Sequence, residues 1–240
     1  NNTQFDIDQD GRFELFIGGK PRTRNWLALS DKASAVTTRH YFEEKTCVAA
    51  DADREPVLTI EALGANPVAA TFSDASVAAG IRRAAQFVRS RTVGMPPMSQ
   101  AKQPAFVGLV PNQFPVPALP ADLGLAAADA HYSMAPYYLA DDEALVMTGQ
   151  WPTCCFANVC LWNRFQQTFD YRNRQVSLNR SQTVLESDGS FRIVLAHQDP
   201  GGNNWIDTEG RNLGLVFWRF MLAEGEIATP QAEVVKFDDL

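Results

Sequence analysis

The stretch SDGSFRIVLAHQDPGGNNWID, residues 187–207, holds the pattern that decides the fold. A turn at Asp188-Gly189 leads into residues 191–195, where large apolar side chains alternate with other residues, as in a β-strand with one buried face. A loop of Asp, Pro, Gly and Asn residues follows and ends at Asn204-Trp205. Turn, strand, loop and Asn-Trp therefore form one supersecondary unit of a β protein.

The same order of residues occurs near the N-terminus, in DIDQDGRFELFIGGKPRTRNWLAL, residues 6–29. The matching segments are, in order, Asp10-Gly11 with Asp188-Gly189, 13–17 with 191–195, and Asn25-Trp26 with Asn204-Trp205. Such self-similarity predicts an internal duplication. Strand-like segments precede the second copy but not the first. We therefore expect the first copy to be truncated at the N-terminus, with an unpaired sheet edge that needs a missing segment or a partner chain.

Other parts of the chain carry β-branched or alternating patterns and predict further strands. These segments are 35–44, 55–63, 132–140, 143–150, 154–165, 176–185, 214–222 and 232–237. One amphipathic helix is predicted over about residues 74–92, with Ser73 or Asp74 as N-cap and an apolar stripe through Val77, Ile81 and Val88. Residues 94–120 contain so many prolines that regular structure is excluded, and their apolar content favours a loop laid against a surface.

These patterns predict a mainly β fold, with antiparallel jelly-roll-like β-sandwiches and one amphipathic helix. We divide the chain into a truncated first sandwich at 1–63, a helix and proline-rich connection at 64–120, and a C-terminal sandwich at 121–240. Because the chain does not begin with Met, we interpret it as a fragment of a longer protein.

Charge and composition restrict the partners. The 240 residues carry a net charge of −7, which argues against nucleic acid as a partner. A membrane span needs roughly 20 consecutive apolar residues, and no such run occurs. We expect a soluble protein, cytoplasmic rather than secreted, that forms homo-oligomers. The four cysteines lack zinc-site spacing and are predicted to be buried or half-buried free thiols; no metal or cofactor is predicted.

Three motifs in the C-terminal half also carry a family resemblance. They are LVMTGQWP, DYRNRQVSLN and AHQDPGGNNWIDTEGRNLG, at 145–152, 170–179 and 196–214. Through them the chain resembles the bacterial "domain of unknown function 1214" family. The resemblance implies a jelly-roll-like domain within a longer protein and carries over no established reaction. Cys154-Cys155 departs from the family pattern, which has an aromatic or polar strand residue there.

Candidate site residues gather in two segments. His197 is the candidate general base and Asp199 the residue that orients it, because imidazole titrates near neutral pH. The alternative is a histidine that anchors its loop. Arginines and amides beside aromatic rings suit an anionic or sugar ligand. The candidate ligand-binding residues are Asp170, Tyr171, Arg172, Arg174, Gln175, Asn179 and Asn204.

Two hypotheses of function follow, and the sequence does not decide whether the protein is an enzyme. In the first, the chain is a ligand-processing or hydrolase-like domain for a small polar, anionic or carbohydrate-like molecule. In the second, it is a non-catalytic binding or assembly module. The first requires His197 to share a cavity with two of Asp170, Arg172, Arg174 and Asp199.

Overall fold

The computed structural model describes residues 1–33, 35–64, 71–90, 92–94, 103–120 and 126–240. The chain forms two compact units, unit 1 (Asn1–His40) and unit 2 (Tyr41–Leu240). The strands are β1 (Phe16–Ile17), β2 (Trp26–Leu27), β3 (Ala130–Tyr138), β4 (Glu143–Gly149), β5 (Phe156–Trp162), β6 (Ser177–Asn179), β7 (Phe191–Ala196), β8 (Trp205–Asp207), β9 (Leu213–Met221) and β10 (Gln231–Lys236). The helices are η1 (Val48–Ala50), η2 (Ala52–Arg54), α1 (Asp74–Ser90) and η3 (Phe237–Asp239).

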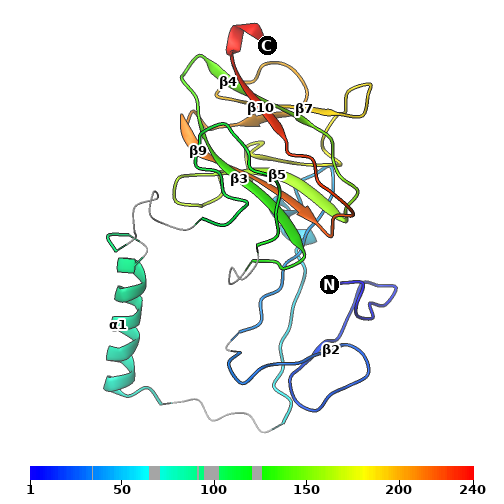
Figure 1. Ribbon diagram of the computed structural model, residues 1–240. Coiled ribbons are helices and arrows are strands. Elements are labelled where there is room, and N and C mark those ends of the chain that lie inside the picture. The colour runs from blue at the N-terminus through cyan, green and yellow to red at the C-terminus, as the bar shows by residue number, and fades with distance from the viewer. Residues whose placement is uncertain (34, 65–70, 91, 95–102, 121–125) are drawn as a thin grey trace. The chain divides into compact units, whose positions relative to one another are not determined.

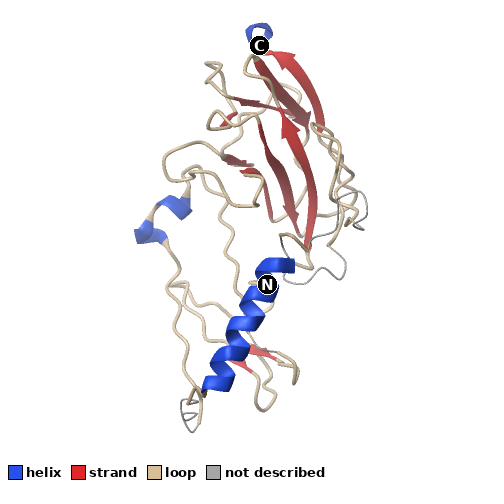
Figure 2. Cartoon of the chain, turned by 90° about the vertical axis from the view of Figure 1, so that its left-hand side faces the viewer, coloured by secondary structure: helices blue, strands red, loops and turns tan. Residues whose placement is uncertain are grey.

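Unit 2 contains two four-stranded sheets that face each other. One sheet has the order β10-β4-β7-β8 and the other β3-β9-β5-β6 (Figure 1). Colouring by secondary structure shows that the longer strands belong to unit 2 (Figure 2). Large apolar residues from both sheets share one core, including Leu145, Leu195, Val159 and Trp218. The mainly β prediction is therefore confirmed.

The alternation of side chains explains this burial. In β9, Val216, Trp218 and Phe220 point toward the core and are at most 1% exposed. Phe217 and Met221 alternate with these residues, face the other side of the sheet and belong to a second apolar cluster. Strands β3, β5 and β9 thus carry apolar residues on both faces, because other segments of the chain also cover the outer face of the sheet.

Part of that cover is the proline-rich segment. Phe106 is 4% exposed and its ring lies 5.4 Å from that of Tyr132. Val107 and Ala118 form bridges to Met134 and Tyr132, along the free edge of β3. The expected loop against a surface is confirmed for residues 103–120, whereas residues 95–102 lie outside the described part of the chain. The loop covers an edge strand that would otherwise expose unpaired backbone groups.

Helix α1 begins where the sequence predicts. Ser73 is the N-cap, and its Oγ accepts a hydrogen bond from the Ser76 N–H at 3.2 Å. The helix ends at Ser90, and none of its residues is buried. Its apolar stripe includes Val77, Ile81 and Val88, which are 48%, 65% and 59% exposed.

Unit 1 and unit 2 contain the same local hydrogen-bond pattern. The Asn25 amide donates to the carbonyls of Asp6 and Glu14, and its oxygen accepts from the Asp6 N–H. The Asn204 amide does the same with the carbonyls of Val184 and Arg192 and the Val184 N–H. Both asparagines have a positive φ, 48° and 60°, a conformation that asparagine tolerates better than most residues.

The two tryptophans repeat the pattern as well. Trp26 Nε1 donates to the Gly18 carbonyl at 2.8 Å, and Trp205 Nε1 donates to the Ala196 carbonyl at 3.2 Å. Each tryptophan begins a strand that runs parallel to the strand before its loop, β2 beside β1 and β8 beside β7. In both units the tryptophan N–H is therefore bonded to a backbone carbonyl of the preceding loop or strand.

Three sequence predictions of local structure need correction. The sheets are not wholly antiparallel, because the Asn-Trp segments return as parallel strands. The predicted strands at 35–44 and 55–63 are wrong, since both segments are irregular. Val57 and Ile60 in the second of them are 91% and 92% exposed. β-Branched residues form a strand only where a neighbouring strand supplies hydrogen-bond partners.

Candidate functional site

His197 follows β7 and is held by a neighbouring loop. Its Nδ1 lies 2.5 Å from Oγ1 of Thr208, which is fully buried. Its Nε2 is buried and has no hydrogen-bond partner among the described residues. Asp199 is exposed, and its carboxylate accepts a hydrogen bond from the Gly201 N–H. Asp199 therefore stabilises its own turn, and the structure shows no hydrogen bond between Asp199 and His197.

Arg174 lies close to this loop and pairs with an aspartate. Arg174 Nη1 is 2.6 Å from Oδ2 of Asp207, whose other oxygen accepts from the Glu209 N–H at 2.7 Å. Glu209 in turn accepts from the Asp170 N–H and from Arg211 Nε. These residues form one polar network at the β8–β9 turn, and Glu209 was not a candidate from the sequence.

Tyr137 completes the network from β3. Its hydroxyl donates to the Arg211 carbonyl at 3.0 Å. Burial raises the pKa of Tyr137 far above its usual range, so its hydroxyl stays protonated as a donor. Every charged group of this network has a partner within the protein. The network is therefore better suited to stabilising the fold than to binding a ligand.

The other candidates of this segment are engaged locally. The Asp170 carboxylate accepts from the Asn173 amide, which lowers the pKa of Asp170. Tyr171 is half-buried and packs against the main core. Arg172 is exposed, with its guanidinium carbon 5.9 Å from the Tyr171 ring centre. The Gln175 amide donates to the Ser177 carbonyl.

Asn179 belongs to a different structure, a clamp on residues 43–45. The Asn179 amide donates to the Glu44 carbonyl at 2.8 Å. Next to it, Arg180 forms a two-pronged pair with Glu43, with distances of 2.5 and 2.7 Å. Gln182 also donates to the Lys45 carbonyl. No local pattern could have identified Glu43, because it lies 137 residues from Arg180 in the sequence.

We predict that Arg180→Ala destabilises unit 2 by about 1–3 kcal/mol, because it leaves the partly buried Glu43 without its partner. The side chains of Arg180 and Glu43 are 32% and 15% exposed. Urea unfolding measures the loss. Arg54→Ala is the matched control, since Arg54 and Glu44 are 42% and 47% exposed, and it should cost less than about 1 kcal/mol. Equal losses in the two variants would contradict the clamp.

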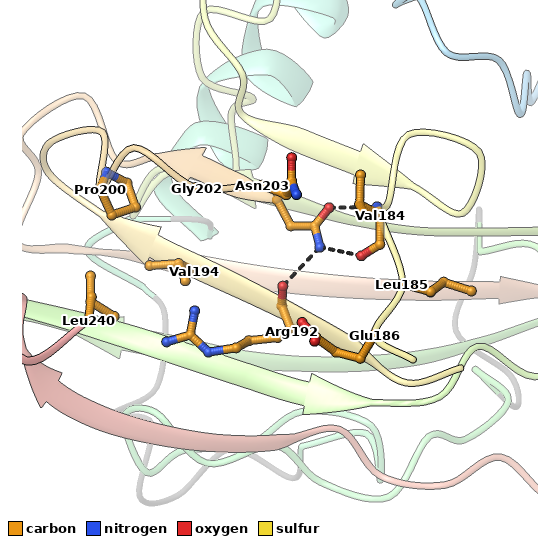
Figure 3. A pocket seen from close by; sticks show the side chains of 10 residues that line it. Val184, Leu185, Glu186, Arg192, Val194, Pro200, Gly202, Asn203 and Leu240 are labelled. Atoms are coloured by element: carbon orange, nitrogen blue, oxygen red, sulfur yellow. Dashed lines mark hydrogen bonds between the residues drawn. The ribbon is translucent and has the colours of Figure 1, made fainter. Parts of the chain in front are cut away.

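A shallow hollow of about 270 Å³ lies on the outer face of the β10-β4-β7-β8 sheet. Figure 3 shows Arg192, Glu186, Val194 and Leu240 around it, with Asn203 at its rim. Asn204 lines it too, but its amide is fully used in the three backbone bonds described above. A second hollow lies beside Val146 and Glu233. His197, Asp170, Arg172, Arg174 and Asp199 line neither hollow.

The cysteines are all unpaired, as predicted. Cys47, Cys154 and Cys160 are half-buried, whereas Cys155 is exposed, contrary to expectation, because it lies in the bend before β5 and not within the strand. Burial raises the pKa of the Cys160 thiol to about 11.

Among the described residues, no three His, Cys, Asp or Glu side chains gather as a metal-ligand set. No helix in the described segments is long and apolar enough to cross a membrane.

Comparison with known proteins identifies the segment that holds these residues. Residues 149–223 match the family model described as "Protein of unknown function (DUF1214)". This segment belongs to the DUF1214 family. The match contains strands β5 to β9, the Arg174–Asp207 pair, and Asn179 and Arg180 of the clamp, but not residues 43–45. The DUF1214 resemblance of the sequence is thus confirmed, and the family description assigns no activity.

Two solved structures are similar to this chain. An uncharacterised protein from Burkholderia cenocepacia shares 25% identity with a TM-score of 0.70, over 99% of this chain. The chain spans 64% of the length of that protein. A protein from Vibrio parahaemolyticus shares 20% identity with a TM-score of 0.40, over 48% of this chain and 33% of its own. No curated protein matches the chain.

Proposed function

We propose that this DUF1214 chain is a non-catalytic binding and assembly module, in which unit 1 offers an apolar sheet face to another polypeptide. The proposal includes the internal duplication, which is supported by the shared hydrogen bonds of Asn25 and Asn204. It also retains the jelly-roll-like connectivity predicted for the sandwich. The observation that carries it is the different burial of matched residues in the two units.

Four apolar positions of the repeat decide the comparison. In unit 2, Phe191, Ile193, Leu195 and Ile206 face the core and are at most 1% exposed. Their matches in unit 1 are Phe13, Leu15, Ile17 and Leu27. Phe13, Ile17 and Leu27 are 41%, 38% and 43% exposed, and Leu15 is half-buried. Full burial of such side chains stabilises by about 1.5–3 kcal/mol each, so this face favours a covering partner.

The ligand-processing hypothesis has less support. It requires His197 in one cavity with the arginines, whereas the two hollows described above are lined by other residues. Arg174 and Asp170 are held by Asp207 and Asn173. The side chains proposed for ligand recognition therefore have protein partners already.

Binding of a hydrophobic fluorescent dye tests whether the unit 1 face is available. We expect Ile17→Asp to reduce dye fluorescence several-fold, since a charge on the face disfavours an apolar ligand. Ile7→Asp is the matched control, because Ile7 is also exposed, at 43%, and lies outside the four matched positions. Equal fluorescence from the wild-type chain and both variants would overturn the proposal, because the face would then be covered already.

A further inference from the structure

We infer that the polypeptide received by unit 1 supplies a β-strand that pairs antiparallel with residues 13–18, with a glycine opposite Phe13. This inference rests on the proposed function and names the partner's local structure. Unit 2 serves as the template for this pairing. In unit 2, β7 matches residues 13–18 of unit 1 and pairs with β4 on the side away from β8. The register of that pair defines the partner strand residue by residue.

Strand β1 of unit 1 is unpaired on the side away from β2. The N–H groups of Phe16 and Gly18 donate to the carbonyls of Asn25 and Leu27, on the β2 side. Because backbone groups alternate along a strand, Leu15 and Ile17 direct their N–H groups to the opposite side. In the described part of unit 1 no strand pairs with that side, since its sheet consists of β1 and β2. In unit 2 the matching residues, Ile193 and Leu195, lie opposite Met147 and Leu145 of β4.

The phenylalanine of the repeat sets a size requirement on the partner. Phe191 lies opposite Gly149 of β4, and a Cβ on Gly149 would lie 2.8 Å from the Phe191 ring. Such a contact is too short to tolerate without a shift of the ring. Phe13 occupies the matching position in unit 1, so the partner strand needs a glycine opposite Phe13. The residues that precede this glycine in the partner strand should be apolar at alternate positions.

A second copy of unit 1 does not meet this requirement. Two copies of the strand could place a glycine opposite Phe13 only by extending the paired region to Gly11, or to Gly18 and Gly19. All three glycines have a positive φ, 78°, 69° and 66°, and so interrupt the extended backbone. We therefore assign the partner strand to a different polypeptide, which is not a second copy of this chain.

The decisive probe is a peptide with the β4 sequence, DDEALVMTGQ, residues 141–150, added to the full chain. Amide hydrogen exchange by NMR reports the pairing. We expect the peptide to slow exchange at Leu15 and Ile17 by about tenfold or more, and to leave Phe16 and Gly18 nearly unchanged. The same peptide with G149V is the matched control and should bind at least about tenfold more weakly.

Each other outcome contradicts a specific statement. No slowing at Leu15 and Ile17, with dye binding intact, would overturn the strand inference and leave the proposed function standing. Equal binding of both peptides would overturn the glycine requirement. Slow exchange at these amides without peptide would overturn the assignment to an external partner. If the exchange rate then depended on protein concentration, a second copy would be the partner. If it did not, a segment of the same chain would be the partner.

Discussion

Replacing Trp218 with alanine is expected to destabilise unit 2 by about 3–5 kcal/mol. Trp218 is fully buried in β9 between the two sheets. Its ring centre lies 5.3 Å from Phe191, 5.6 Å from Trp151 and 6.3 Å from Phe220. Removal of the indole would leave a large cavity among rings that cannot collapse together, because Phe191 is held by β7, Phe220 by β9 and Trp151 by the connection between β4 and β5. Urea unfolding followed by circular dichroism measures the change.

Two variants control this prediction. Trp218→Phe should cost less than half as much, because it keeps an aromatic ring and removes an indole N–H that has no hydrogen-bond partner. Phe165→Ala removes an aromatic ring that is 74% exposed and should change stability by less than about 0.5 kcal/mol. If Trp218→Ala were no worse than Phe165→Ala, the shared core of the two sheets would be refuted.

Replacing Asn204 with alanine is expected to destabilise unit 2 by about 2–4 kcal/mol. Three hydrogen bonds to backbone groups of Val184 and Arg192 would be lost. Alanine would also be strained at the φ of 60° that this residue adopts. If Asn204 served mainly to bind a ligand, the same substitution would have little effect on the free energy of unfolding.

The variants Asn204→Gly and Asn204→Asp separate the two causes. Glycine tolerates the positive φ but loses the hydrogen bonds, so it should be less damaging than alanine. Aspartate keeps an acceptor for the Val184 N–H but places a charge against two carbonyl oxygens, so it should be at least as damaging as glycine. A loss below about 0.5 kcal/mol in all three variants would contradict the structural role.

The candidate site shows where sequence reasoning succeeds. The Asn-Trp motif was identified because both copies place the same residues in the same order, and the structure gives both asparagines and both tryptophans the same bonds. The residues grouped as ligand-binding are close in sequence but serve different structures. Asn179 holds residues 43–45, whereas Arg174 pairs with Asp207 near the β8–β9 turn.

Local pattern alone indicated the strands of unit 2 other than β8, the start and approximate extent of α1, and the repeated Asn-Trp unit, because side-chain alternation and capping act between residues close in sequence. The tertiary structure decided which strands have partners. Residues 55–63 have a strand-like sequence and no ladder, whereas 191–196 form β7 between β4 and β8. It also decided the partners of Arg180 and Arg174, and it left Phe13 exposed where Phe191 is buried. These ion pairs join residues 33 and 137 positions apart along the chain, and no local pattern carries that information.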